Sequence, residues 1–335
     1  MSSVEISRAN PLDHAGEIKH LFVTHDHPEF PEFFDRAYPS AVRSGASSWI
    51  GVDTDRRLVM HIGQFPHRFA LGEQTVIAGL LVNLLVAKAH RTFLPALSLL
   101  RRMAKESQAE AALDFLYGDP STAAQAVFKS AGFSTVGMLD RFVLPLAGRR
   151  WYTDAAVRIY GMTVALGAHS RRFATVRQEA SSFNADAFER PLGHAPALRP
   201  FRPRALYHGR LPGYPGRTDY WFTVQSRGRS TSVRAAVFVR GEADGTARLL
   251  TVARPPDIAL TAIVPGLATA LRRLGYSRLW IFTLTGTRLA NELSRAGFAP
   301  RHETTPLIAL ALTQLGVQAM ESTSTWEITE LDCDR

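Results

Sequence analysis

The stretch LLVNLLVAKAHRTFLPALSLLRRM, residues 80–103, is the most informative part of the sequence for the fold. The apolar run Val76–Val86 predicts a strand that is covered on both faces. A basic turn, 87–91, ends this strand, and apolar residues spaced three and four apart predict a helix over Pro95–Ser107. Free backbone N–H groups at the start of a helix lie at the positive end of its dipole. The sequence therefore predicts a site for an anion, such as a phosphate group, at this turn.

Strands and helices alternate on both sides of this stretch, which predicts a mixed α/β fold. Asp119 and Pro120 predict the start of a helix, and Gly132 is typical of the residue just after its end. Strands are predicted at 4–8, 47–52, 57–71, 76–86, 114–117 and 133–146, and helices at 12–24, 31–38, 95–107 and 119–131.

The first half of this pattern repeats later in the chain. A shift of 165 residues lays FKSAGF, 128–133, on LSRAGF, 293–298. The same shift carries the strand 113–117 to 278–282, the helix from Pro95 to Leu260, and Leu85-Val86 to Leu250-Thr251. One shift that serves several elements in order predicts a duplicated fold.

The chain of 335 residues is long enough for two domains. We expect domains at 1–149 and 218–335, joined by a proline- and arginine-rich helical connector at 150–217. No stretch is apolar for long enough to predict a membrane-spanning helix. The N-terminus lacks the pattern of a secretory signal, and the single cysteine, Cys333, excludes an internal disulfide. A cytoplasmic location is the expectation.

Positive charge is concentrated in the middle of the chain. Residues 141–240 contain 17 arginines and five acidic residues, whereas the whole chain has a net charge of +9. This excess suggests an anionic partner or substrate. The alternative is compositional, since arginine replaces lysine almost throughout the chain and many of these side chains would simply be solvated.

The two copies differ at the turn before the helix. In the first copy Arg91 adds a charge that can bind phosphate oxygens in a bidentate manner. In the second copy Pro255 and Pro256 cannot donate, and Asp257 would itself hold the N-cap. We therefore expect a pyrophosphate at the first turn only. Its predicted backbone donors are Thr92, Phe93, Leu94, Ala96 and Leu97.

These elements resemble the GNAT family, the Gcn5-related N-acetyltransferases. The family signature Arg-x-x-Gly-x-Gly/Ala is matched by Arg91–Ala96, and its Tyr-x-x-x-Gly-Phe helix end is matched by Phe128–Phe133. The resemblance implies two domains, each with a mixed, mainly antiparallel sheet that carries a splayed parallel strand pair and flanking helices. It implies that acetyl-CoA or another acyl-CoA binds in the first copy, with the pantetheine arm on Leu84, Leu85 and Val86.

The resemblance further implies that the pyrophosphate lies against Arg91, Thr92, Phe93, Leu94 and Ala96, and that Phe128 lies at the cofactor. Two departures from the family pattern matter. Leu94 and Pro95 replace a glycine and a donor in the loop, and Phe128 replaces a tyrosine that often protonates the departing thiolate. Since a thiol has a pKa of about 8.5, CoA can leave without strong acid assistance.

The first copy offers three candidate catalytic residues. Asn83 is the only polar side chain in its strand, and it could act on substrate or be the hydrogen-bonded residue of a bulge. His61 could act as a base or be a satisfied core histidine. Tyr117 could supply the proton that Phe128 cannot, or be a packed tyrosine at a strand end.

Other reactive residues point to weaker hypotheses. His25-Asp26-His27 has zinc-like spacing but no further ligands nearby, so we expect no metal and prefer a contact with substrate. Asp332 and Asp334 could line a shared cleft or solvate the terminus. These acids argue against a nucleophilic Cys333, because they raise a thiol pKa.

The function expected from this resemblance is transfer of an acyl group, most simply acetyl, from CoA to the primary amine of a small molecule or amino sugar. The tandem layout also resembles the Fem-type transferases, and the basic middle segment keeps an aminoacyl-tRNA-dependent transferase as an alternative. A non-catalytic CoA-binding regulatory protein is the other alternative. DNA binding is not expected, because no helix-turn-helix or zinc pattern is present.

Overall fold

The protein is described here from a computed structural model. The structure describes residues 4–146, 173–179, 198–201, 217–226, 233–254 and 258–329. Most of the connector predicted at 150–217, the second-copy turn at 255–257 and the terminal residues Asp332, Cys333 and Asp334 lie outside these ranges. Among the described residues, no helix combines the length and the apolar character needed to cross a membrane.

The first half of the chain forms the elements that the sequence predicts, with shifts of up to three residues at their ends, except that the helix predicted at 31–38 continues to Arg43. Its strands are β1 (Glu5–Ala9), β2 (Ser47–Val52), β3 (Leu58–Leu71), β4 (Gln74–Val86), β5 (Phe115–Gly118) and β6 (Ser134–Pro145). Its helices are α1 (Ala15–Val23), α2 (Phe30–Arg43), α3 (Phe93–Glu110) and α4 (Thr122–Ser130), and a 3-10 turn, η1 (Lys88–His90), precedes α3.

The second half repeats this plan. Its strands are β9 (Thr218–Ser226), β10 (Val233–Gly241), β11 (Thr246–Ala253), β12 (Arg278–Leu284), β13 (Ala299–Pro300) and β14 (Thr305–Ala311). Its helices are α7 (Leu260–Arg273), α8 (Arg288–Arg295), α9 (Gln314–Glu321) and the 3-10 turn η3 (Thr323–Thr325). Two strands come from the connector, β7 (Phe173–Glu179), which pairs with β9, and β8 (Leu198–Phe201), which pairs with β3.

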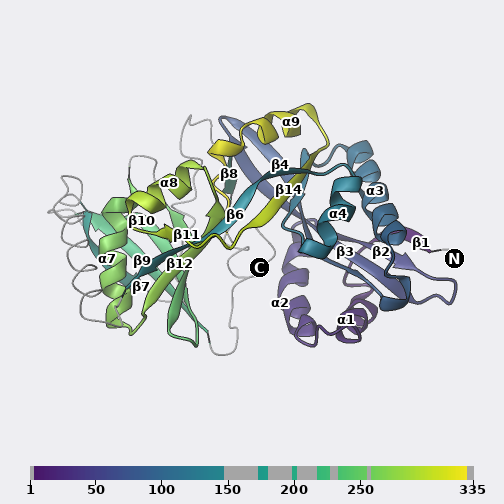
Figure 1. The fold of residues 1–335 in the computed structure, drawn as a ribbon, viewed down its shortest axis with the longest axis horizontal. Helices are drawn as coiled ribbons and strands as arrows, with labels where there is room; N and C mark the ends of the chain where they lie inside the picture. The colour runs from purple at the N-terminus through teal and green to yellow at the C-terminus, as the bar shows by residue number, and fades with distance from the viewer. Residues whose placement is uncertain are drawn as a thin grey trace.

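All these strands belong to one continuous sheet (Figure 1). Two pairs are parallel, β4 with β5 and β11 with β12, and the other pairs of named strands are antiparallel. The last strands of the two copies are exchanged. β6 leaves the first half to pair with β12, and β14 returns from the second half to pair with β5. This exchange joins the two halves through backbone hydrogen bonds, and the sequence analysis did not predict it.

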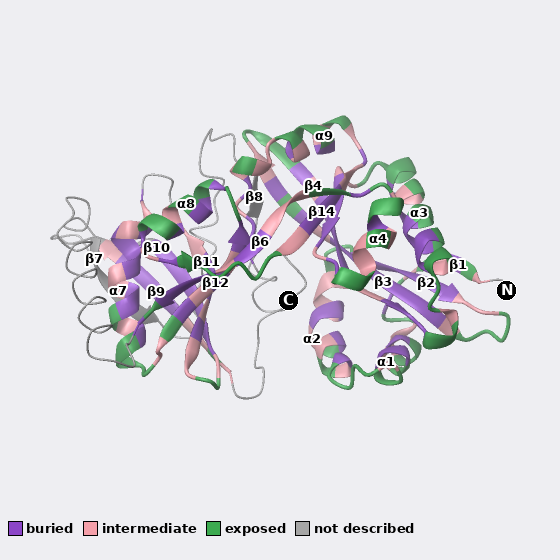
Figure 2. Ribbon diagram, in the orientation of Figure 1, coloured by how far each residue is buried: buried purple, intermediate pink, exposed green. Residues whose placement is uncertain are grey.

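The described residues form two hydrophobic cores, each built mainly by one half of the chain and completed by residues of the other half (Figure 2). In the first half, helices cover both faces of β3. Phe22 of α1 contacts His61 on one face, and on the other face Gln64 donates to Ser107 of α3 at 2.9 Å. This two-sided cover explains why β4, the neighbour of β3, reads as a nearly unbroken apolar run.

The start of α4 corrects one prediction. The helix begins at Thr122 with Ser121 at the N-cap, so Asp119 does not cap it as predicted. The predicted end is confirmed, since Gly132 has a φ of +98°, a left-handed value that glycine adopts at little cost.

The repeat is confirmed in part. A shift of 165 residues carries β5 to β12 and α4 to α8. The strand before the helix needs a longer shift, because Ala78 pairs with Phe115, 37 positions later, whereas Thr246 pairs with Arg278, only 32 positions later. The predicted match of Leu85-Val86 with Leu250-Thr251 is therefore wrong by five residues (37 − 32), mainly because α7, with 14 residues, is four shorter than α3, with 18.

Gly316 lets α9 pack directly on the start of β5. A Cβ atom at this position would lie 1.9 Å from the backbone oxygen of Asp114. We expect Gly316→Ala to lower the free energy of unfolding by about 3 kcal/mol, because the backbone must move to admit the methyl group. Urea unfolding measures this change.

The matched control is Gly16→Ala in α1, where a Cβ meets nothing within 4 Å. Alanine there should be neutral or stabilising by up to about 1 kcal/mol. Equal stability of the two variants would contradict the close packing of α9 on β5.

Candidate functional site

The candidate site is a gap that opens between β4 and β5. The two strands pair in parallel only over Ala78–Leu80 and Phe115–Tyr117. Beyond Leu80, β4 continues to Val86 while it pairs with β3 alone. One edge of β4 therefore has no strand partner over its last six residues, and a ligand could pair with backbone groups on that edge.

A β-bulge lies in this part of β4. His61 pairs with Leu85 and Gly63 pairs with Val82, so Asn83 and Leu84 together face Ile62. Asn83 has a φ of +57°, which is uncommon outside glycine and which asparagine tolerates better than most residues. The sequence analysis left a bulge as one alternative for Asn83, and the structure places it there.

Two side chains hold the bulge in place. The amide of Asn83 donates to the Tyr38 hydroxyl at 3.1 Å, and the Asn83 carbonyl oxygen lies 3.1 Å from Nδ1 of His61. Because a carbonyl oxygen can only accept, Nδ1 carries the proton and Nε2 accepts from the Ser48 hydroxyl at 2.9 Å. Both ring nitrogens of His61 are thus engaged, and the ring is fully buried.

His61 is neutral at physiological pH. Burial lowers its pKa to about 4, although the bond to the Asn83 carbonyl oxygen acts in the opposite direction. The predicted base therefore has the right protonation state, but its ring lies behind the bulge and against Phe22 and Tyr38. This position suits a residue that fixes the shape of β4.

The low pKa of His61 predicts that stability falls in mild acid. The unfolded histidine, with a pKa near 6.5, takes up a proton that the folded ring does not, so the free energy of unfolding falls as pH decreases from 6.5. Over pH 6.5 to 5 the loss amounts to about 2 kcal/mol. Urea unfolding of the wild type and of His61→Gln at both pH values measures it.

His61→Gln should be less stable than the wild type at pH 7 and should lose less stability on acidification. Because the carboxylates of the two proteins are the same, the difference between their pH profiles isolates His61. Parallel profiles would contradict a buried, neutral histidine.

Two backbone positions of β4 face the open gap. The N–H of Ala87 donates to the Val59 carbonyl oxygen of β3 at 2.8 Å. Since successive residues of a strand direct their backbone groups to alternate edges, Leu85 also faces β3 while Leu84 and Val86 face the gap. Nε of Arg91 donates to the Val86 carbonyl oxygen at 3.3 Å, which agrees with this assignment.

The turn after β4 leads to an uncapped helix N-terminus. α3 begins at Phe93 with Thr92 at the N-cap, no side chain caps it, and its first turn holds no acidic residue. Thr92 donates its own N–H to the His90 carbonyl oxygen at 2.7 Å. Ala96 is buried and lies far enough into the helix to donate within it.

The predicted anion site therefore has fewer free backbone N–H donors than the sequence suggested. Pro95 has no N–H, so Phe93 and Leu94 are the two orphan donors of the first turn. Arg91 precedes them, and its side chain is tied to the end of β4 by the bond from Nε to Val86. A guanidinium and two N–H groups at the positive end of a helix can bind one phosphate group.

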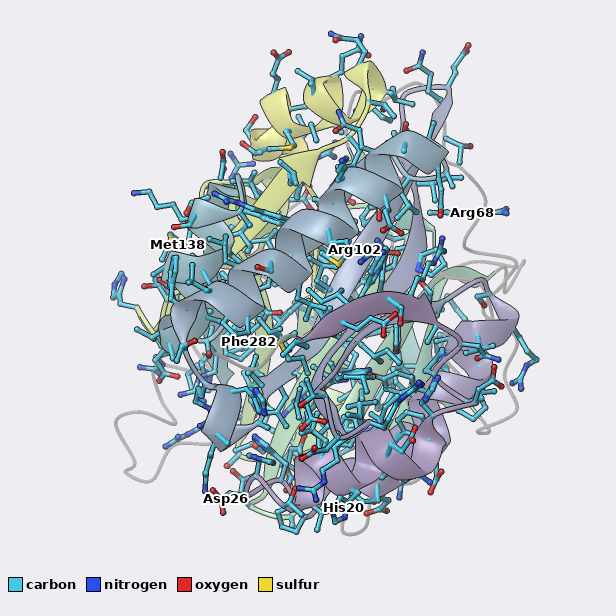
Figure 3. The ribbon with its side chains drawn as sticks, turned by 90° about the vertical axis from the view of Figure 1, so that its right-hand side faces the viewer. His20, Asp26, Arg68, Arg102, Met138 and Phe282 are labelled. Atoms are coloured by element: carbon cyan, nitrogen blue, oxygen red, sulfur yellow. The ribbon has the colours of Figure 1, made fainter. Side chains whose placement is uncertain are left out.

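The loop that was considered for a metal instead supports this turn. Nε2 of His25 accepts from the Lys88 N–H at 2.9 Å, and Asp26 forms an ion pair with the Lys88 ammonium at 2.8 Å. Asp26 lies at the edge of the molecule, in the turn after α1 (Figure 3). In the described part of the chain, no three metal-binding side chains come together.

Tyr117 and Phe128 lie in the core. The Tyr117 hydroxyl is buried and lies 2.7 Å from Nδ1 of His67, and the ring packs on Phe69 and Phe115. Phe128 is buried against Phe133, with 5.1 Å between ring centres. Neither side chain presents a free polar group to the gap.

The equivalent gap in the second half is occupied by the chain itself. β11 and β12 pair only over Thr246–Arg248 and Arg278–Trp280, and then separate. Thr329 bridges them, since it pairs with Thr283 of β12 and its hydroxyl donates to the Leu250 carbonyl oxygen of β11 at 3.0 Å. The Thr283 hydroxyl donates to the Ile328 carbonyl oxygen at 2.8 Å.

The arginine of the second turn is also occupied. Arg254 is mostly buried, donates to the Ile258 carbonyl oxygen and forms an ion pair with Glu292 of α8. The sequence analysis expected this copy to refuse a pyrophosphate because of residues 255–257, which lie outside the described ranges. The C-terminal segment is a separate obstacle that sequence reasoning missed, because nothing local to residues 326–329 indicates where they dock.

Comparison with solved structures assigns the fold. The chain is similar to the GCN5-related N-acetyltransferase from Anabaena variabilis ATCC 29413, with a TM-score of 0.64 and 13% identity over 94% of this chain and 74% of that chain. It is similar to the GCN5-related N-acetyltransferase from Kribbella flavida, with a TM-score of 0.63 and 10% identity over 92% and 72%. A tandem GNAT protein from the clavulanic acid biosynthesis pathway gives 0.53 and 12% over 93% and 99%.

No protein-family model and no curated protein sequence matches the chain. The fold is that of the GCN5-related N-acetyltransferases, and the likeness to a tandem member of that class covers nearly all of both chains. The resemblance stated from the sequence is thus confirmed at the level of the fold. The further likeness to Fem-type transferases is not shown by these comparisons and stays a prediction.

Proposed function

We propose that the protein transfers an acyl group, most simply acetyl, from CoA to a primary amine, and that the gap between β4 and β5 binds the acyl-CoA. The observation that carries this proposal is the combination of three features along one edge. They are a bulged strand with an edge that has no strand partner, an arginine at the end of that strand, and an uncapped helix N-terminus.

In this proposal each part of the acyl-CoA has its own partner. The amide groups of the pantetheine arm pair with the backbone of Leu84 and Val86, as an added strand pairs with a sheet edge. The pyrophosphate lies against Arg91 and the N–H groups of Phe93 and Leu94. Leu85 contributes its side chain, because its backbone faces β3.

The bulge supplies the polarising group. A bulge directs the N–H of one residue out of the strand ladder, where it can donate to the thioester carbonyl oxygen as negative charge develops there. Asn83 belongs to the bulge, and we assign its side chain to contact with the acceptor amine. His61 acts as a positioning residue, since it fixes the Asn83 carbonyl oxygen.

The proton balance needs no acid from Phe128. The amine attacks the thioester carbon, the carbon–sulfur bond breaks, and CoA leaves as a thiolate. The corresponding thiol has a pKa of about 8.5, so the thiolate is a reasonable leaving group. Because His61 is buried, we assign the amine proton to water. Tyr117 takes no part in this proton balance, because its buried hydroxyl lies 2.7 Å from Nδ1 of His67.

The test is release of free CoA thiol from acetyl-CoA over a panel of amino sugars and small primary amines. The proposal expects amine-dependent thiol release, with the acetylated amine found by mass spectrometry. CoA binding without turnover on any amine would favour the regulatory protein instead. Binding of tRNA that weakens steeply with salt, without acetyl-CoA binding, would favour the aminoacyl-tRNA-dependent transferase.

A further inference from the structure

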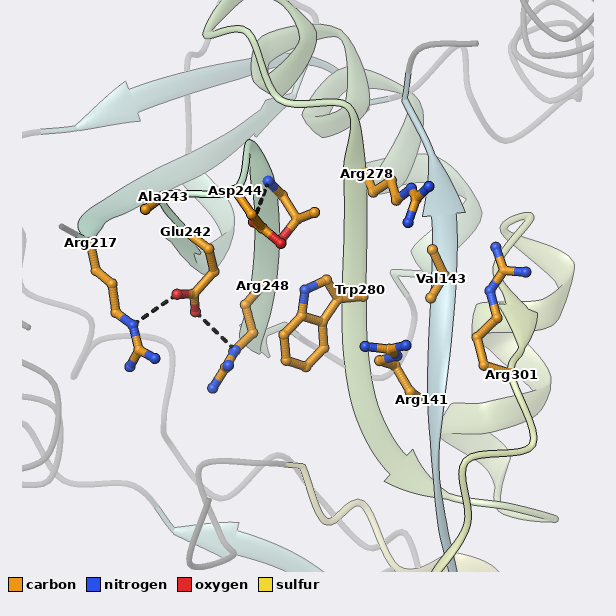
Figure 4. A pocket seen from close by; sticks show the side chains of 11 residues that line it. Arg141, Val143, Arg217, Glu242, Ala243, Asp244, Arg248, Arg278, Trp280 and Arg301 are labelled. Carbon is orange, nitrogen blue, oxygen red and sulfur yellow. Dashed lines mark hydrogen bonds and ion pairs between the residues drawn. The ribbon is translucent and has the colours of Figure 1, made fainter. Parts of the chain in front are cut away.

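A second candidate site, whose lining side chains are drawn in Figure 4, lies in the other half of the molecule. It is on the sheet face turned away from α7. It is a cavity of about 460 Å³ in the described part of the chain. A cavity of this size can hold a ligand as large as a nucleotide. Its lining residues are Arg141, Val143, Arg217, Glu242, Ala243, Asp244, Thr246, Arg248, Arg278, Trp280 and Arg301.

Strand alternation places these polar side chains together. Ala247, Leu249, Leu279 and Ile281 are buried in the core beneath α7. Their neighbours along β11 and β12 point to the opposite face, so Arg248 and Trp280, which are also paired in register, lie side by side there. β6 adds Arg141 through the strand exchange described above.

The cavity carries an excess of positive charge. Five arginines line it against two acidic residues, Glu242 and Asp244. Glu242 is shared by Arg217 at 2.8 Å and Arg248 at 3.2 Å. Asp244 accepts from the N–H and the hydroxyl of Thr246, and these bonds lower its pKa.

Three arginines of the cavity have guanidinium N–H groups that could donate to a ligand. Arg278 and Arg301 form no ion pair with any residue that the structure describes, although the charge of Arg278 contributes to the lowered pKa of Asp244. Arg141 pairs with Glu303 through one terminal nitrogen, while its Nε is buried without an acceptor among the described residues. A buried donor without an acceptor is costly, and an anion in the cavity would satisfy it.

Trp280 positions two of the guanidinium groups. The Arg248 guanidinium carbon lies 4.3 Å from the ring centre and that of Arg141 lies 5.8 Å away, on opposite sides of the indole in Figure 4. Stacking on an aromatic ring holds the planar guanidinium in one orientation, which lowers the cost of bidentate binding to phosphate.

We propose that this cavity binds a phosphorylated small molecule. The three-charge excess matches a phosphate monoester or a pyrophosphate better than a single carboxylate, and the fork geometry of the arginines suits phosphate oxygens. The concave shape favours a small molecule over the backbone of an RNA. The site is separate from the gap between β4 and β5 and does not depend on the proposed acyl transfer.

The test is calorimetric titration with inorganic pyrophosphate in an Arg91→Glu background, which removes binding at the first turn. The site variant is Arg278→Glu with Arg301→Glu. The control is Arg272→Glu with Arg273→Glu, which makes the same charge change on α7, where both residues are exposed. Thermal unfolding checks that all the variants fold.

We expect one pyrophosphate per chain in the background and in the control, and binding roughly 100-fold weaker in the site variant, because two charge-assisted contacts are lost. Equal binding by the site variant and the control would overturn the proposal, as would no binding in the background at millimolar pyrophosphate. Binding of tRNA alone, lost in the site variant, would instead make this face an RNA surface.

Discussion

Arg91→Glu is expected to weaken acetyl-CoA binding at least about 100-fold, because the change removes a charge-assisted contact to phosphate and places a negative charge beside it. The reversed side chain also loses the bond from Nε to the Val86 carbonyl oxygen, which ties the turn to the end of β4. Calorimetric titration of acetyl-CoA into the wild type and the variant measures the effect.

The matched control for this titration is Arg68→Glu. Arg68 is an exposed residue of β3 that points away from the molecule in Figure 3, and its substitution makes the same change in net charge. We expect it to bind acetyl-CoA as the wild type does. If Arg91→Glu binds as tightly as Arg68→Glu, the pyrophosphate does not lie at the turn after β4.

Trp326→Ala is expected to lower the free energy of unfolding by about 3–5 kcal/mol, the usual range for a buried tryptophan. Trp326 is fully buried, its ring centre lies 5.6 Å from that of Phe115, and its Nε1 donates to the Ala319 carbonyl oxygen at 2.8 Å. Urea unfolding of the variant measures the loss.

Trp326 also anchors the segment that fills the second gap, because Ile328 and Thr329 come only two and three residues after it. Hydrogen exchange at 249–253 of β11 should therefore rise in Trp326→Ala. Trp326→Phe keeps most of the apolar contact and should lose only about 1–2 kcal/mol. A Trp326→Ala protein as stable as the wild type would contradict the role of Trp326 as the anchor of this segment.

Local sequence patterns predicted the first half of the fold well. β2 was predicted at its observed bounds, and β3, β4 and α3 differ from the prediction by a few residues at their ends. These elements carry strong periodicity and clear breakers, such as the basic turn before α3. Asn83 stood out because it interrupts an apolar run, and the same interruption marks the bulge.

Features that depend on distant pairing could not be predicted. β6 and β14 have no pattern that tells a partner in their own copy from one in the other copy, so their exchange was missed. The same limit hid the docking of Thr329 between β11 and β12. The arginine cavity was indicated only as a surplus of charge in 141–240, because Arg248, Arg278 and Arg301 join it from outside that segment.

Side-chain environment was the other limit. The sequence offered His61 as a base or a core residue, and only the structure reveals that both of its nitrogens are engaged and that burial lowers its pKa. The loss of Thr92 as a phosphate donor likewise depended on one bond, from its N–H to the His90 carbonyl oxygen, that no spacing rule indicates.

The most direct test of the central claim is hydrogen exchange with and without saturating acetyl-CoA. The account predicts new protection at the amides of Leu84, Val86, Phe93 and Leu94 and none at 249–253 of β11. Protection of β11, or binding of a second equivalent of acetyl-CoA, would show that the ligand displaces the C-terminal segment from the gap between β11 and β12. Acetyl-CoA binding without protection at the first gap would contradict the assignment of the site.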